Sequence, residues 1–284
     1  MTPHPVEPGT EEGWSVIDVA VRSAQARLGE RLLSAYAIGS LAHGGFSRAV
    51  SDIDLALLTD ERRDRDMTAV VAAVAADVAG SGLALGNRLS VFHAPWDRFA
   101  DPPGDARFPP IDRHDLMHYG RLVAGRDLRD VYGRSPGAAE IREQAVDSAL
   151  RRVTPRQLRI ELRRLARGGI TVHDASKTVL WPARLQHVCD TGRATGNGPA
   201  VEHYLALADA RHRALVADAL DWRNRGAVTD PQAARRRIGD EIGDLHAEVL
   251  ARVSRRPDVP RRDEIALRAR RLTAARWQRF SGRP

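Results

Sequence analysis

Two aspartates separated by one apolar residue, Asp52 and Asp54, occur in the segment AIGSLAHGGFSRAVSDIDLALL, which is otherwise rich in small and apolar residues. Side chains two residues apart on a β-strand point to the same face, so the two carboxylates are expected to project together. A bare charge is costly to bury, so a cationic partner is expected beside them. Two carboxylates, completed by phosphate oxygens and water, suit Mg²⁺. The pattern therefore predicts that Asp52 and Asp54 are metal ligands.

A Gly-Ser pair, Gly39 and Ser40, precedes the two aspartates. We expect the pair to end a strand and to open a helical turn, where backbone N–H groups and a hydroxyl can hold phosphate oxygens. Ser51, directly before the first aspartate, is a further candidate for nucleotide contact. Carboxylates that hold a metal ion, together with backbone amides that hold phosphate oxygens, form an arrangement suited to phosphoryl transfer. A magnesium-bound nucleoside triphosphate, such as ATP, is therefore the expected ligand.

Helices and strands alternate around these residues in the first half of the chain. Apolar residues at helical spacing predict helices over 14–29 and 66–80. Short apolar or alternating runs predict strands over 33–39, 52–60 and 88–95. This alternation indicates a small sheet domain that carries the candidate residues.

From about residue 138 onward the apolar residues follow a helical period. Two segments open with recognisable caps, Thr154-Pro155 and Asp230-Pro231. The helical segments cover 138–153, 154–169, 173–192, 198–222, 230–253 and about 260–280. We therefore predict an antiparallel helical bundle, joined to the first half near the sequence GRSPG.

Composition is that of a globular protein, with 43% hydrophobic and 29% charged residues. No stretch approaches the roughly 20 apolar residues of a membrane helix, and the acidic, Pro-rich start resembles neither a signal nor a transit peptide. We therefore expect a cytoplasmic protein without a membrane partner. The net charge is +7, but basic and acidic residues are interleaved, so we do not expect a nucleic-acid partner. Cys189 is the only cysteine, which excludes an intramolecular disulfide and indicates a packed core thiol.

The spacing of the two motifs carries a family resemblance. The stretch IGS at 38–40, eleven further residues and DIDL at 52–55 resemble the signature of the DNA polymerase β-like nucleotidyltransferase superfamily. The two-domain plan looks most like the aminoglycoside nucleotidyltransferases, which adenylylate a hydroxyl of streptomycin or spectinomycin. The resemblance implies the α+β class, with a small mixed-sheet nucleotidyltransferase domain over 1–135 and an all-α helical bundle domain over 136–284.

The resemblance also implies an activity. The expected reaction is Mg²⁺-dependent transfer of a nucleoside monophosphate, AMP from ATP in the first place, to a hydroxyl of a small-molecule acceptor. An aminoglycoside-like acceptor would imply antibiotic resistance. One alternative keeps the reaction but replaces the small molecule with a protein or RNA acceptor. Another is a catalytically impaired nucleotide-binding protein with a regulatory or antitoxin-like role.

In the second half, the stretch ARLQHVCDTGRATG at 183–196 resembles the family's helix that ends in a Thr-Gly-basic turn. The resemblance implies that Asp174, upstream on that helix, is a carboxylate near the substrate and a candidate catalytic residue. A helix N-cap is the other interpretation of Asp174. The family's nucleotide-contacting lysine corresponds to Asn197, so Arg193 is expected to hold a phosphate in its place.

The pattern departs from the family at the third acid, which falls on Ser90 in the strand over 88–95. A serine cannot act there as a base. Asp97 and Asp101 follow in a segment that reads as an exposed loop, and His93 reads as a packed or surface residue. Three outcomes stay open: a base from the helical domain, with Asp174 first, a weak catalyst with a different acceptor, or nucleotide binding without transfer. The intact aspartate pair favours catalysis, because an unused pair of buried like charges is a liability.

Overall fold

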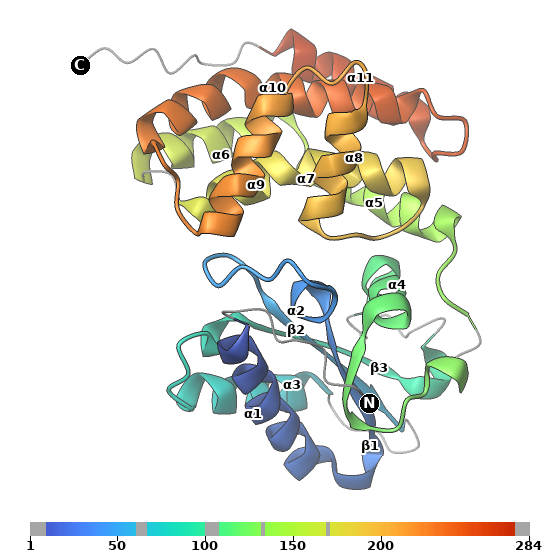
Figure 1. Cartoon of the computed structure of the whole chain (residues 1–284). Helices are drawn as coiled ribbons and strands as arrows, with labels where there is room; N and C mark the ends of the chain where they lie inside the picture. The colour runs from blue at the N-terminus through green and yellow to red at the C-terminus, as the bar shows by residue number, and fades with distance from the viewer. Residues whose placement is uncertain (1–9, 61–66, 100–107, 132–133, 169–170, 276–284) are drawn as a thin grey trace. The chain divides into compact units, whose positions relative to one another are not determined.

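The computed structural model describes residues 10–60, 67–99, 108–131, 134–168 and 171–275. Contacts divide the chain into two compact units, Met1–Pro136 and Gly137–Pro284. This division lies one residue beyond the boundary expected from the sequence. Among the described residues, every strand belongs to the first unit, whereas the second contains only helices and turns (Figure 1).

A four-stranded mixed sheet forms the centre of the first unit. Its order is β3-β2-β1-β4, with β2 and β3 parallel and the other two pairs antiparallel. The strands are β1 (Leu32–Ile38), β2 (Ile53–Thr59), β3 (Leu89–Pro95) and β4 (Arg121–Gly125). The helices are α1 (Glu11–Leu28), α2 (Gly39–His43), α3 (Met67–Gly80) and α4 (Pro110–Tyr119). The α+β class with a small mixed sheet is thereby confirmed.

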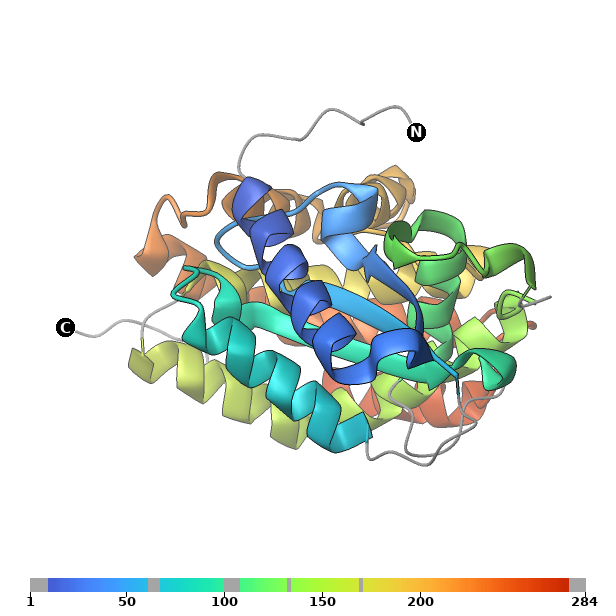
Figure 2. The same ribbon diagram turned by 90° about the horizontal axis from the view of Figure 1, so that it is seen from below.

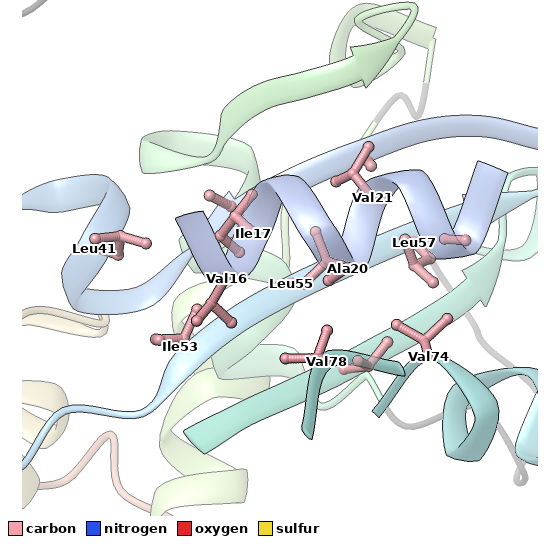
Figure 3. Packing of buried hydrophobic residues seen from close by; sticks show 14 of the residues in the cluster. Val16, Ile17, Ala20, Val21, Leu41, Ile53, Leu55, Leu57, Val74 and Val78 are labelled. Atoms are coloured by element: carbon pink, nitrogen blue, oxygen red, sulfur yellow. The ribbon is translucent and has the colours of Figure 1, made fainter. Parts of the chain in front are cut away.

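One face of the sheet is covered by α1 and α3, as Figure 2 shows. Ile53, Leu55 and Leu57 alternate along β2 and are fully buried against this layer. Val16 of α1 and Val74 of α3 belong to the same hydrophobic cluster (Figure 3). The alternation fixes the register of β2, because a shift by one residue would turn this apolar row to the other face.

The opposite face of the sheet is covered by α4. Tyr36 of β1 and Ala56 and Leu58 of β2 are buried there together with Leu116 of α4. Because side chains two apart on a strand share a face, Asp54 lies on the same side as Ala56. The α4 side is therefore the side of the sheet that carries the predicted metal ligand.

The sequence pattern does not predict α4 or β4. Helix α4 begins with Pro110 in its first turn and ends at Gly120, whose N–H donates to the carbonyl of Leu116 at 3.0 Å. Inside the helix, the polar residues 113–115 are buried. An amphipathic helix usually carries apolar residues at its buried positions, but α4 carries polar ones there. The helix therefore shows no apolar periodicity in the sequence.

Helices are the only regular elements of the second unit among its described residues. The predicted caps are confirmed: the Asp230 carboxylate accepts from the first-turn N–H groups of the helix that follows, and the Thr154 hydroxyl accepts from the N–H of Gln157 at 3.0 Å. The helices are α5 (Ala138–Arg152), α6 (Pro155–Gly168), α7 (Val172–Thr191), α8 (Asn197–Ala206), α9 (Arg213–Arg225), α10 (Pro231–Ser254) and α11 (Arg262–Ala274).

The prediction of one helical run over 198–222 is wrong. This segment forms two helices, α8 and α9, with a turn between them. Glu248 of α10 is buried and holds this turn. Its carboxylate accepts from the Tyr204 hydroxyl at 2.8 Å and from the Arg211 side chain at 2.9 Å. Arg252 adds a further hydrogen bond at 2.8 Å. A buried carboxylate satisfied in this way stabilises a break that periodicity does not reveal.

Helix α7 continues through a buried proline, Pro182. Proline has no N–H, so the carbonyl of Thr178, four residues earlier, lacks its usual helical donor. His246 of α10 stacks on Trp181 with ring centroids 5.8 Å apart, and it is buried without a hydrogen-bond partner for either ring nitrogen among the described residues. The irregular part of α7 is thus packed against one imidazole ring of α10.

Cys189 near the end of α7 is fully buried, and this burial raises the pKa of its thiol to about 12. The prediction of a packed core thiol is confirmed. Within the described ranges, no helix has both the length and the apolar character needed to cross a bilayer.

Candidate active site

Gly39 lies where β1 ends and α2 begins, which confirms the predicted passage from strand to helical turn. Its φ is +66°, a conformation that favours glycine. A Cβ atom at this position would lie 2.4 Å from Oδ2 of Asp54. The glycine therefore allows the Asp54 carboxylate to lie directly against the backbone of the turn.

The two predicted metal ligands differ in their surroundings. Asp54 is half-buried on β2, where it pairs in register with Ile38 of β1. Asp52 precedes the strand and is exposed, while Ile53 between them is fully buried. The expectation that both carboxylates belong to a buried strand is wrong for Asp52, because β2 begins one residue after it. Only the Asp54 carboxylate is partly withdrawn from water.

The position expected to carry a third acid lies beside Asp54. In the parallel pair of β2 and β3, Ser90 is the register partner of Asp54. His93 pairs with Leu57, is 8% exposed and therefore lies with the opposite layer of the sheet, away from Asp54. Asp97 is exposed in the short turn that follows β3, and Asp101 lies outside the described residues.

Asp115 of α4 is a site residue that the sequence reasoning missed. It is 7% exposed, and its Oδ2 accepts the N–H of Gly39 at 2.5 Å. Its Oδ1 lies 3.7 Å from Nε2 of His43, at the end of α2. In this structure the Gly39 N–H is directed at a carboxylate, and nucleotide contact through Gly39 stays a prediction. No spacing in the sequence links Asp115 to the Gly-Ser pair, since the link is a backbone hydrogen bond.

The two candidate serines have different roles in the structure. Ser51 is 3% exposed, and its hydroxyl accepts the N–H of Ser47 at 2.9 Å. The Ser51 N–H returns a hydrogen bond to the Ser47 carbonyl at 2.8 Å, so this serine closes the turn that leads to Asp52. Ser40 is half-buried in the first turn of α2. Nucleotide contact through Ser40 or Ser51 stays a prediction.

The donor set fits a metal that is shared with a substrate. Among the described residues, no group of three or more His, Cys, Asp or Glu side chains is arranged to hold one ion. Asp52 and Asp54 offer two hard oxygen donors next to each other along the chain. Magnesium commonly takes one or two carboxylates and completes its octahedron with water and phosphate. The residues present therefore fit Mg²⁺ bound together with a triphosphate.

The predicted residues of the helical unit lie at the two ends of α7. The N-cap is Thr171, whose hydroxyl accepts from the N–H of Asp174 at 3.1 Å, so the interpretation of Asp174 as the N-cap itself is corrected. The Asp174 carboxylate accepts from the Thr171 hydroxyl at 2.7 Å and pairs with Arg164. Arg193 is exposed after the helix end at Gly192, and Asn197 begins α8. Their roles toward nucleotide or acceptor stay predictions.

Comparisons with known proteins show a likeness of fold to a solved structure. Neither the protein-family models nor the curated proteins contain a match to this sequence. Among solved structures, the chain is similar to spectinomycin adenyltransferase AAD(9) from Enterococcus, which was crystallised with ATP and spectinomycin. The TM-score is 0.62 at 11% sequence identity, over 85% of this chain and 99% of that chain. The likeness shows the fold, and it confirms the resemblance in fold that the two sequence motifs predicted.

Proposed function

We propose that this protein is a Mg²⁺-dependent nucleotidyltransferase. It would transfer a nucleoside monophosphate, AMP from ATP in the first place, to a hydroxyl of a small acceptor such as spectinomycin or streptomycin. The observation that supports this most directly is the contact between Gly39 and Asp54. A Cβ at Gly39 would lie 2.4 Å from the Asp54 carboxylate, which supports a site where the turn at Gly39 and Ser40 would hold phosphate directly beside a metal ligand.

In the proposed reaction, the oxygen of the acceptor hydroxyl bonds to the α-phosphorus, and the bond from that phosphorus to the β-phosphate oxygen breaks. Pyrophosphate leaves, and the hydroxyl proton is lost to a base. Ser40 would donate its hydroxyl and backbone N–H to phosphate oxygens of the nucleotide. Asp52 and Asp54 would hold Mg²⁺, which when bound neutralises charge on the phosphate oxygens.

Pyrophosphate release tests the proposal. The purified protein is incubated with Mg²⁺ and ATP, GTP, CTP or UTP, against a panel of aminoglycosides that includes spectinomycin and streptomycin, and of other polyols. We expect release that depends on both acceptor and nucleotide. Asp54→Asn and Asp52→Asn should lower this release at least about a hundredfold, because a neutral amide is a poor ligand for Mg²⁺.

Asp130→Asn is the matched control, because Asp130 is an exposed carboxylate elsewhere in the first unit. It should release pyrophosphate at the wild-type rate. Full activity in Asp54→Asn would show that the metal site is assigned to the wrong residues. Activity toward an aminoglycoside would imply a role in antibiotic resistance, and the need for ATP would imply a cytoplasmic location.

A second candidate function is nucleotide binding without transfer. Ser90 supports it, because the strand position beside Asp54 carries a hydroxyl in place of an acid. This candidate predicts Mg²⁺-dependent binding of ATP, measured by calorimetry, with no pyrophosphate release for any acceptor of the panel. The same two measurements therefore separate the two functions.

A further inference from the structure

Asp115 reaches the nucleotide-binding turn from the helix that covers the sheet. It belongs to α4, and its side chain is only 10% exposed. Oδ2 of Asp115 accepts the N–H of Gly39 at 2.5 Å. Hydrogen bonds to a charged acceptor are shorter and roughly twice as strong as neutral ones. The contact is therefore a strong anchor for the first residue of α2.

The other oxygen of Asp115 is directed toward the last residue of the same short helix. Oδ1 lies 3.7 Å from Nε2 of His43, and the His43 ring packs edge-on against Tyr119 of α4 at 5.8 Å between centroids. Nδ1 of His43 lies 3.1 Å from the carbonyl oxygen of Gly44. Helix α2 is thus held against α4 at both of its ends, and Asp115 takes part in both contacts.

Asp115 and Asp54 approach the same glycine from two sides. Asp115 binds the N–H of Gly39, while Asp54 occupies the space that a Cβ of Gly39 would fill. With ordinary backbone geometry, the two carboxylates are no more than about 7.5 Å apart through Gly39. Among the described residues, Asp115 is not grouped with Asp52 and Asp54 in an arrangement that could hold one metal ion.

We infer that Asp115 is a positioning residue of the site proposed above: it binds the Gly39 amide and thereby sets the Gly39–Ser40 turn against Asp54. This inference rests on the proposed function, since the turn matters through the nucleotide that it receives. Because Asp115 occupies the Gly39 N–H, Ser40 is the residue of this turn that would contact the phosphate. Asp115 acts through Gly39, and its negative charge is not itself required by the reaction.

Asp115→Asn and Asp115→Ala separate this role from a role in proton transfer or metal binding. Asparagine keeps a carbonyl oxygen that can accept the Gly39 N–H, whereas alanine removes the acceptor. We expect Asp115→Ala to raise both the KM for ATP and the Kd for Mg-ATP by about tenfold to a hundredfold, as for the loss of a charged hydrogen bond. Asp115→Asn should raise them by less than about tenfold, with kcat close to that of the wild type.

The measurements are pyrophosphate release with the acceptor panel, calorimetric binding of Mg-ATP and thermal melting of each variant. Asp130→Ala, which removes an exposed carboxylate in the first unit, is the control and should match the wild type. The inference is overturned if Asp115→Ala binds Mg-ATP as tightly as Asp130→Ala does. It is also overturned if Asp115→Asn loses as much kcat as Asp115→Ala, because the carboxylate charge would then take part in the reaction.

The two proposals can fail separately. If the wild type binds Mg-ATP but transfers to no acceptor, the transferase proposal fails, and the Kd values of the two Asp115 variants still decide the positioning role. If the wild type transfers and Asp115→Ala is unchanged, the positioning role fails and the transferase remains. If the wild type does not bind Mg-ATP, both are overturned. Should Asp115→Ala fail to fold, Asp115→Asn with a loss of kcat at unchanged melting temperature would overturn the inference, and retained kcat would support it.

Discussion

Asp54 of β2 and Ser90 of β3 are direct neighbours across the parallel pair of strands at the candidate site. A hydroxyl there can neither neutralise a metal ion nor take a proton at neutral pH. The two carboxylates that contact Gly39 come instead from Asp54 of β2 and Asp115 of α4. This relationship makes Ser90 the position where charge can be added next to Asp54 with the least change in size.

Ser90→Asp should make the protein more dependent on Mg²⁺ for stability. Like charges directly opposite each other on neighbouring strands are destabilising, so without Mg²⁺ we expect a melting temperature lower by about 1–3 °C. Added Mg²⁺ should recover this loss, because a third carboxylate strengthens the ion site. Ser90→Asn is the control of equal size without charge. Equal melting of the two variants, with and without Mg²⁺, would contradict the proposed ion site beside Asp54.

Gly39→Ala and Gly45→Ala distinguish backbone strain from displacement of Asp54. Both glycines have positive φ, +66° and +78°, so each alanine should cost about 1 kcal/mol of stability. Only at Gly39 would the new Cβ meet Asp54 Oδ2, at 2.4 Å, whereas nothing lies within 4 Å at Gly45. The Asp54 carboxylate must therefore move in Gly39→Ala, and we expect weaker binding of Mg-ATP by calorimetry in this variant alone. Equal affinities in the two variants would speak against a role of Asp54 as ligand.

His246 should make the protein less stable as the pH falls below neutrality. Burial lowers the pKa of His246 from 6.5 to about 4. Between these values the unfolded chain binds a proton that the folded chain does not, so the free energy of unfolding rises with pH through this window. The contribution that is present at pH 7 and lost by pH 4 amounts to about 3 kcal/mol.

Urea unfolding of the wild type and of His246→Gln at several pH values between 4 and 7 measures this contribution. The glutamine variant should show a flatter dependence on pH. His173→Gln is the control, because His173 is exposed on α7, the helix against which His246 packs. If the wild type and His246→Gln have parallel pH profiles, His246 does not titrate as its burial indicates.

The sequence was sufficient for the local features of the site. The alternation of Ile53, Leu55 and Leu57 fixes β2, and with it the face of Asp54. The Gly-Ser pair marks the end of β1, since few residues other than glycine accept the conformation found at Gly39. The sequence also placed a serine, Ser90, at the strand position expected to carry a third acid. In the structure, Ser90 is the register partner of Asp54.

The remaining features depend on contacts that leave no pattern in the sequence. Asp115 contacts the site through the backbone N–H of Gly39. Every residue except proline has such an N–H, so the residue type at position 39 does not predict a contact with Asp115. Helix α4 is hidden because its buried residues 113–115 are polar. Likewise, the break between α8 and α9 depends on Glu248, which is distant in sequence and acts through side-chain hydrogen bonds. In each case, tertiary contact overrides the local pattern.

Pro182 of α7 gives a different kind of consequence, because it couples two residues that belong to separate helices. Because proline has no N–H, Pro182 leaves the Thr178 carbonyl without its helical donor, in the part of α7 where Trp181 stacks on His246 of α10. An alanine at position 182 would return the helical donor to Thr178, in the turn of α7 that carries Trp181. The effects of changes at Pro182 and His246 are therefore not additive, and in a set of related sequences these two positions would be expected to change together.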